Sequence, residues 1–210
     1  MADDAAAWTA AGFTVQGDRV RIGTVSFHLV GSEEGSAGIT AWRLAGLSVP
    51  GASVDGLPTE VVAEPDHDDD GPAGPAHPNG VIGLDHVVVA TPDLERSIEA
   101  FTAIGLELRR VRDLGETGTG LRQAFFRLGT TVLEVVGGPT GSGATATEAP
   151  ATWFGIAVDV ADLDASAAFL GEGLGRVKAA VQPGRRIATL RHAAFGMTLV
   201  VAAMDHDPRH

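Results

Sequence analysis

The stretch IGLDHVVVATPDLERSIEAF at Ile82–Phe101 decides the fold. Its first half is a short apolar run rich in valine, which predicts a strand over residues 82–90. Asp93 follows Pro92 at the position of a helix cap, and apolar residues then recur at helical spacing. Further apolar runs predict three strands, at residues 106–112, 122–128 and 130–136. The predicted order of elements is therefore βαβββ.

The same order returns towards the C-terminus. WFGIAVDV at 153–160 predicts a strand, Asp162 takes the cap position, and 165–170 predicts a helix. The text of the two units also matches, because AFTAIGLEL resembles AFLGEGLGR and RLGTTVLEVV resembles AAFGMTLVVA. Strands of the second unit are predicted near residues 174–181, 186–192 and 197–203. Internal repetition on this scale predicts a duplicated supersecondary unit.

The N-terminal part carries further, incomplete copies. WTAAGFTV at 8–15 resembles FTAIGLEL, and RIGTVSFHLVG at 21–31 resembles RLGTTVLEVVG. GITAWRL at 38–44 resembles the strand GIAVDV, and a shortened connection leads to a strand at 59–64. We predict degenerate, N-terminally truncated modules over 1–62, a linker over 63–80, complete modules over 81–139 and 151–204, and a tail over 205–210.

The linker contains the text EPDHDDDGPAGPAHPNG at Glu64–Gly80, which holds almost nothing to bury. His67 and the three aspartates after it superficially resemble a metal cluster. In a segment rich in proline and glycine we expect these groups to be solvated charge instead. His77, His206 and His210 are given no role.

Composition narrows the classes of function. The chain has 210 residues, of which 44% are hydrophobic, so it can bury a substantial core. Its net charge of −12 argues against binding to nucleic acid or to an anionic membrane surface. The absence of cysteine excludes disulfides and thiolate ligands, so a metal would need His, Asp or Glu. We found neither a secretory signal nor an apolar span, which predicts a cytoplasmic protein, and the residue usage is typical of a bacterial one.

DHVVVATPDLERSIEAF followed by RQAFFRLGTTVLEVVG resembles the vicinal oxygen chelate superfamily, which includes glyoxalases, bleomycin-resistance proteins and dioxygenases. The resemblance covers 81–204 well and 1–62 weakly. It implies an α+β fold in which paired βαβββ modules form curved mixed sheets around an open cleft. In that superfamily the cleft usually holds a divalent metal, with ligands on the first and last strands of each module. Because its members differ widely in activity, the fold alone does not settle function.

The resemblance places two metal ligands in the first module. His86 stands at the first-strand position and Glu134 at the last-strand position, a donor set that suits Zn, Fe, Mn, Ni or Co. The second module has Gly155 and Val201 at the corresponding positions, and neither side chain binds a metal. His28, which aligns with Glu134 in the N-terminal copy, is a candidate third ligand. The alternative is that His86 and Glu134 form a hydrogen-bonded pair and that His28 is a satisfied strand residue.

Other residues are candidates for chemistry and recognition. His192, on the predicted third strand of the second module, is a candidate general acid or base. Arg122 and Arg191 are candidates to bind a carboxylate or phosphate, and Phe125 is a candidate to line an apolar cleft. The alternatives are solvated strand-face residues for His192 and the arginines, and a core residue for Phe125.

Two functions follow from these observations. The first is an enzyme of the glyoxalase or dioxygenase type, a lyase, isomerase or dioxygenase that acts on an unidentified small molecule, with a divalent metal in the cleft. The second is a metal-free protein of the bleomycin-resistance type that binds or sequesters a small molecule in the same cleft. In either case the expected partners are the small molecule and, because a module edge is exposed, a second copy in a homodimer.

Overall fold

The computed structural model describes residues 1–31, 35–63, 74–114, 120–138 and 149–206. Cα packing divides the chain into two compact units that do not follow chain order. Unit 1 contains residues 1–39, 67–85 and 155–210, and unit 2 contains residues 40–66 and 86–154. The N-terminal part, which we predicted to hold degenerate modules, is thus shared between the units, because residues 1–39 belong to the first and residues 40–66 to the second. The linker residues 64–73 and the tail residues 207–210 lie outside the described residues.

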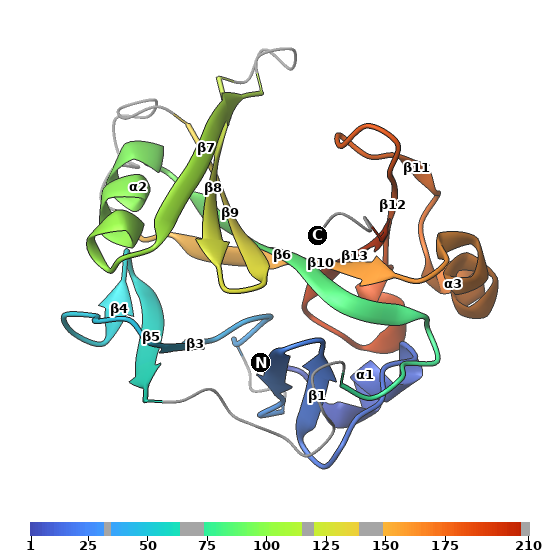
Figure 1. Ribbon diagram of the computed structural model, residues 1–210. Coiled ribbons are helices and arrows are strands. Elements are labelled where there is room, and N and C mark those ends of the chain that lie inside the picture. The colour runs from blue at the N-terminus through green and yellow to red at the C-terminus, as the bar shows by residue number, and fades with distance from the viewer. Residues whose placement is uncertain (32–34, 64–73, 115–119, 139–148, 207–210) are drawn as a thin grey trace. The chain divides into compact units, whose positions relative to one another are not determined.

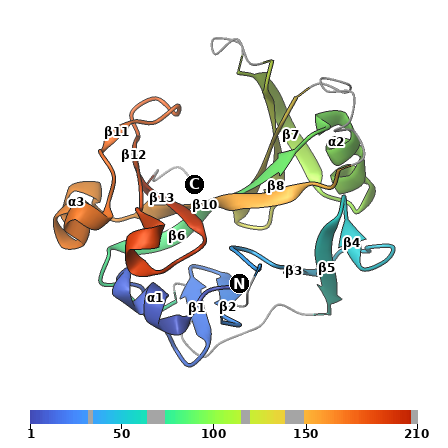
Figure 2. The same cartoon turned by 180° about the vertical axis from the view of Figure 1, so that it is seen from behind.

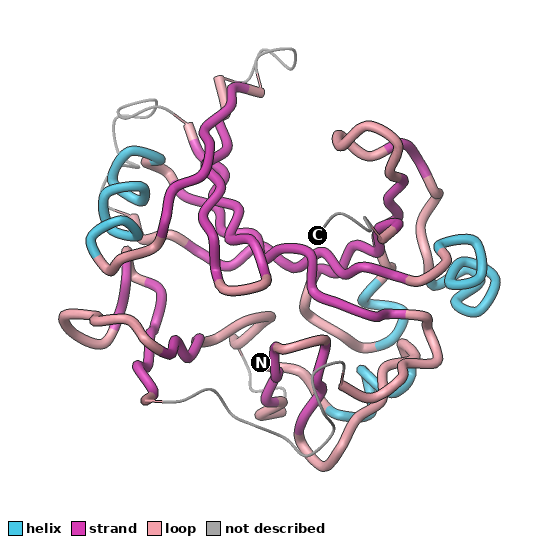
Figure 3. Tube along the Cα trace, viewed as in Figure 1, coloured by secondary structure: helices cyan, strands magenta, loops and turns pink. Residues whose placement is uncertain are grey.

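Strands dominate both units (Figure 3). In unit 2 the main sheet contains β6 (Val81–Thr91, from His86 onwards), β7 (Glu107–Asp113), β8 (Arg122–Leu128) and β9 (Thr131–Gly137). Their order is β6-β9-β8-β7, with β6 parallel to β9 and the other pairs antiparallel. The helix α2 (Leu94–Ala103) contacts β7, β8 and β9 and covers one face of this sheet (Figure 1). A predicted βαβββ module is therefore present in unit 2.

Residues 40–66 add a small second sheet to unit 2. It consists of β3 (Trp42–Ala45), β4 (Ser53–Val54) and β5 (Leu57–Val62), with β5 in the middle. The ring of Trp42 on β3 packs edge-on against Phe101 of α2, with ring centroids 6.0 Å apart. Phe101 in turn contacts Phe126 of β8 at 5.6 Å. These aromatic contacts join the small sheet to the helix-covered face of the main sheet.

Unit 1 contains the second module. Its strands are β10 (Thr152–Val160, from Gly155 onwards), β11 (Lys178–Ala179), β12 (Arg186–Thr189) and β13 (Val200–Asp205). Their order is β11-β12-β13-β10, with β10 parallel to β13 and the other pairs antiparallel. The helical segments of this module are α3 (Leu163–Leu170) and the short 3-10 helices η2 (Gly171–Gly173) and η3 (His192–Phe195).

The N-terminal part of unit 1 packs on this module. The helix α1 (Ala5–Ala10) lies beside the antiparallel hairpin of β1 (Arg19–Ile22) and β2 (Val25–His28), as Figure 2 shows. Trp8 of α1 is fully buried, and its ring lies 5.7 Å from that of Phe27 on β2. Its Nε1 donates to Asp3, whose other carboxylate oxygen accepts from Thr198 N at 2.6 Å.

Both helix caps predicted from the repeated aspartates are confirmed. Asp93 accepts from Arg96 N at 3.1 Å at the start of α2. Asp162 accepts from Asp164 N at 2.9 Å and from Ala165 N at 3.1 Å at the start of α3. A carboxylate at this position satisfies amide groups that the first turn leaves without partners. None of the described helices is long and apolar enough to cross a membrane.

The expectation that Glu64–Gly80 holds almost nothing to bury is wrong for the last residues of this segment. His77 is 8% exposed and Asn79 is 2% exposed, and both are held by main-chain groups of unit 1. Thr14 N donates to His77 Nδ1 at 3.0 Å, and His77 Nε2 lies 2.9 Å from Arg21 O. Asn79 Nδ2 donates to Ala11 O at 2.9 Å. The composition of this segment gave no sign of burial, because the segment has few apolar side chains. Its polar side chains are buried because they form hydrogen bonds with buried main-chain groups.

Candidate functional site

The candidate site lies on the face of the unit 2 sheet that α2 does not cover, which we call the open face. Side chains alternate between the two faces of a strand. The residues on the helix-covered face are almost fully buried, as Val89, Ala124 and Leu133 show. The residues between them point to the open face and are half-buried: His86, Val88, Gln123, Phe125, Val132, Glu134 and Val136.

A row of polar side chains crosses this face from β6 to β7. His86 Nε2 lies 3.5 Å from Glu134 Oε2, and their side chains are only 15% and 13% exposed. The other carboxylate oxygen of Glu134 accepts a hydrogen bond from Gln123 Nε2. Gln123 Oε1 accepts from Arg112 Nε at 2.6 Å. The row therefore runs His86, Glu134, Gln123, Arg112 on four adjacent strands, and valines surround it.

Two arginines of β7 lie over Phe125 on the same face. The guanidinium carbon of Arg110 is 4.9 Å from the centroid of the Phe125 ring, and that of Arg112 is 5.5 Å away. Both distances are within the range of cation–π attraction. A bulge in β7 between Leu108 and Arg110 sets this arrangement, because the extra residue turns Arg110 and Arg112 to the open face.

Arg122 lies on the opposite face from Phe125, although both belong to β8. It lies three positions before Phe125, and an odd offset along a strand turns its side chain to the helix-covered face. There it pairs with Glu95 of α2 and, at 3.2 Å, with Asp113 of β7. The structure therefore does not bring Arg122 together with His86 and Glu134.

The other predicted site residues belong to unit 1. The prediction that a strand carries His192 is wrong, because β12 ends at Thr189 and His192 begins η3. A glycine with positive φ, Gly196, ends this short 3-10 turn. Arg191 is exposed at its start, and His28 ends β2 with its side chain half-buried. The roles assigned to His28, Arg191 and His192 stay predictions.

His86 and Glu134 fit two positions of a metal site but not a whole one. Two ligands about 2.1 Å from a tetrahedral ion are about 3.4 Å apart, close to the 3.5 Å between His86 Nε2 and Glu134 Oε2. Catalytic sites normally use three protein ligands. Among the described residues, however, no three His, Asp or Glu side chains are grouped so that they could hold an ion. The donor set present therefore does not fit a complete metal centre.

The second module cannot supply the missing ligands at the matching positions. His86 pairs with Val132, and Glu134 lies two residues after Val132. In the second module Gly155 pairs with Val200, so the residue that corresponds to Glu134 is Ala202. The prediction that Val201 matches Glu134 is wrong by one residue, and Val201 is fully buried on the other face. A Cβ atom at position 155 would lie 2.5 Å from Val200 O. This close approach of the strands leaves no room for a side chain there.

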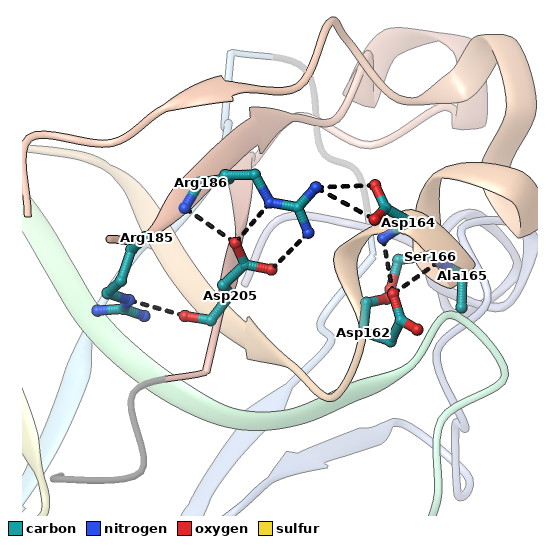
Figure 4. Close-up of polar contacts among 7 residues, drawn as sticks. All are labelled: Asp162, Asp164, Ala165, Ser166, Arg185, Arg186 and Asp205. Carbon is teal, nitrogen blue, oxygen red and sulfur yellow. Dashed lines mark hydrogen bonds and ion pairs between the residues drawn. The ribbon is translucent and has the colours of Figure 1, made fainter. Parts of the chain in front are cut away.

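Charged residues of unit 1, most of them from the second module, form ion pairs with one another instead. Arg186 pairs with Asp205 at 2.9 Å and with Asp164 at 2.9 Å (Figure 4). The hydrogen bonds from Arg186 hold the pKa of the Asp205 carboxyl below its ordinary value. Arg185 is 6% exposed and pairs with Asp159 at 2.6 Å and with Asp85 at 3.1 Å. Burial, followed by the nearby charge of Asp85, raises the pKa of Asp159.

Sequence reasoning found three members of the open face, His86, Glu134 and Phe125, and missed three. Gln123 carries a usable signal, since it is two residues before Phe125 and therefore shares its face. Arg110 and Arg112 carry no such signal, because the bulge before Arg110 interrupts the alternation along β7.

Solved structures resemble parts or most of this chain. Methylmalonyl-CoA epimerase from Mycobacterium tuberculosis is 21% identical, with 62% of this chain and 91% of that chain covered and a TM-score of 0.46. Glyoxalase I from Zea mays is 19% identical, with 61% and 44% covered and a TM-score of 0.42. A xylose isomerase-like TIM barrel/4-hydroxyphenylpyruvate dioxygenase fusion protein is 12% identical, with 97% and 47% covered and a TM-score of 0.56. The last likeness extends over nearly the whole chain and shows the fold alone.

No curated protein sequence matches this chain. A sequence model of the Glyoxalase/Bleomycin resistance protein/Dioxygenase superfamily matches residues 83–207, the part that holds both complete βαβββ modules. The match agrees with the α+β fold and with the mixed sheets of the two units. Because it spans more than half of the chain, this protein belongs to the Glyoxalase/Bleomycin resistance protein/Dioxygenase superfamily.

Proposed function

We propose that this protein acts on a small organic molecule bound on the open face of unit 2, with His86 and Glu134 as its proton-transfer pair. The observation that carries the proposal is the polar row His86, Glu134, Gln123, Arg112 among the valines and Phe125 of the open face. Apolar surface with a few convergent polar groups is typical of small-molecule sites.

The row supports a division of roles among its members. Glu134 lies within ion-pair distance of the imidazole, so it orients the ring of His86. Gln123 fixes the carboxylate of Glu134 by a hydrogen bond, and Arg112 fixes Gln123. A half-buried carboxylate is costly to place on an apolar surface, and this chain of donors offsets that cost. His86 then takes a proton from a bound molecule or returns one to it.

A divalent metal is common in this superfamily, but no step of the proposal passes through one. His86 and Glu134 supply two donors, fewer than the three protein ligands that a catalytic ion normally needs. The full chain, purified without chelator, should therefore contain less than about a tenth of an equivalent of any transition metal. A stoichiometric metal that is lost in His86→Gln would contradict this expectation.

The test of proton transfer is exchange of substrate carbon-bound hydrogen for deuterium in D2O, followed by NMR with a panel of carbon acids such as 2-oxo acids and 2-hydroxy ketones. The full chain should accelerate exchange in at least one compound. His86→Gln and Glu134→Gln should each lower that rate by about a hundredfold or more. The control is Glu107→Gln, a glutamate of β7 that pairs with Arg109 at 2.8 Å on the exposed surface and should leave the rate unchanged.

A second candidate is binding without chemistry, as in a sequestering protein. The specific observation in its favour is that Gly155 and Ala202 replace the His86 and Glu134 positions in the second module. Under this function a panel compound binds and raises the melting temperature, but no hydrogen exchanges. Exchange that survives unchanged in both His86→Gln and Glu134→Gln would remove the acid/base pair from the first proposal.

A further inference from the structure

Arg110 and Arg112 are placed on the open face in a way that the acid/base pair does not explain. Their guanidinium groups lie over the ring of Phe125, and Arg112 also donates its Nε to Gln123. Among the described residues, the ion pairs found include neither of these arginines. Two guanidinium groups thus lie at one ring, and no carboxylate of the described residues forms an ion pair with either of them.

The rest of unit 2 shows how unusual this placement is. Several other arginines of unit 2 form ion pairs with acidic side chains. Arg43 pairs with Glu60 at 2.8 Å, and Arg96 pairs with Asp55 at 2.7 Å. The chain as a whole carries a net charge of −12, so acidic partners are plentiful. Two like charges that share one ring repel each other, and an anion bound between them removes that repulsion. The guanidinium fork matches the oxygens of carboxylate and phosphate groups.

The strand order fixes how far such an anion lies from the proton-transfer pair. The guanidinium of Arg110 lies over Phe125 of β8, and the imidazole of His86 lies next to Glu134 of β9. Adjacent strands are about 4.8 Å apart, and β6 and β8 lie on either side of β9. The anionic group and the reacting atom of one ligand should therefore be separated by about 5 to 10 Å. Between them the ligand would lie on the valines of the open face.

We propose that the ligand of the open face is a small organic anion, a carboxylate or a phosphate monoester, whose charged group is bound by Arg110 and Arg112. This assignment rests on the proposed function, because it takes the His86–Glu134 pair as the place where the other end of the ligand lies. It adds a class of ligand and two specificity-determining residues to that function. The shared chemistry is a group of at least two anionic oxygens next to an apolar body.

The test compares three probes of similar body on the full chain by isothermal titration calorimetry: 3-phenylpropanoate, its neutral amide, and 2-phenylethyl phosphate. Both anions should bind at least about tenfold more tightly than the amide. The double variant Arg110→Gln/Arg112→Gln should remove this preference, so that the two anions bind no more tightly than the amide. Comparison of the two anions shows whether the site favours carboxylate or phosphate.

Arg109→Gln is the matched control, because Arg109 is on the same strand and pairs with Glu107. It should keep the preference for the anions. Equal binding of the amide and the anions, or an equal loss in Arg109→Gln, would overturn the anion site while leaving the open face as a binding surface. If none of the three probes binds the parent protein, the anion site is overturned as well. The proposed proton transfer is then judged separately by deuterium exchange in neutral carbon acids.

Discussion

The two complete modules share their scaffold and differ in what their sheet faces carry. In each of them the first strand pairs in parallel with the last, as β6 does with β9 and β10 with β13. Each helix begins at an aspartate, Asp93 or Asp162, that accepts hydrogen bonds from the first turn. The faces differ, however, because His86 and Glu134 of the first module correspond to Gly155 and Ala202 of the second.

This difference separates what folding needs from what chemistry needs. A cap and a buried strand pair stabilise each module by themselves, so both copies retain them. A polar row on a sheet face contributes to function but costs desolvation, so a copy without that function is more stable with small residues there. The second module instead places its charges around Arg185 and Arg186, where they form ion pairs.

Removal of Arg185 should have the largest effect. Arg185→Met would remove the guanidinium that lies between the carboxylates of Asp85 and Asp159, each with a side chain only 14% exposed. We expect a loss of about 4 kcal/mol in the free energy of unfolding at neutral pH, measured by urea denaturation. The neighbouring variant Arg186→Met removes ion pairs that are largely exposed and should cost much less.

The stability of Arg185→Met should also depend on pH in a way that tests the same ion pairs. Burial and Asp85 already raise the pKa of Asp159, and the loss of Arg185 should raise it further. A carboxyl with a raised pKa binds more protons in the folded than in the unfolded chain, so the variant should regain stability as the pH falls. Equal losses in Arg185→Met and Arg186→Met, unchanged by pH, would show that the buried charges do not depend on one another.

A methyl group at position 155 should have the next largest effect. Gly155→Ala places a Cβ atom 2.5 Å from Val200 O and 2.9 Å from Val200 Cβ, which the strands can relieve only by moving apart. We expect a loss of about 3 kcal/mol in the free energy of unfolding. Gly83→Ala, whose Cβ would meet nothing nearer than 3.9 Å, is the matched control and should change stability by less than about 1 kcal/mol. Equal losses of stability in the two variants would mean that the lack of space for a side chain does not explain the glycine at position 155.

The fold could be predicted from the sequence because its signals are local and occur twice. Local sequence patterns predict the cap at Asp93, the valine-rich strand and the final hairpin of the first module. The same patterns recur in the second module and support the same prediction. How the N-terminal copies are shared could not be predicted. The division after Ile39 follows from tertiary packing, such as that of Trp42 on Phe101, which no local pattern encodes.

The site could be predicted only where a residue's face follows from its position in a regular strand. His86 and Glu134 lie on uninterrupted strands, and their separation of 3.5 Å agrees with the expected pairing. Arg122 was a candidate to bind an anion, and the alternation along β8 places its side chain on the opposite face from Phe125, where it pairs with Glu95. Arg110 and Arg112 depend on a bulge, a feature that strand propensity does not reveal.

The smallest predicted effect concerns the buried histidine of unit 1, which differs from His86 in its partners. His86 faces a carboxylate, whereas His77 accepts from Thr14 N and donates to Arg21 O, so the fold holds it as one neutral tautomer. Burial lowers the pKa of His77. The unfolded chain therefore binds more protons below about pH 6.5, and stability that is complete above this pH is lost as the pH falls.

Between about pH 7.5 and 5.5 we expect His77 to account for at most about 1 kcal/mol of unfolding free energy, measured by urea denaturation. His77→Gln should be less stable than the parent at the higher pH and should lose less on acidification. An unchanged pH slope in that variant would contradict the lowered pKa of His77.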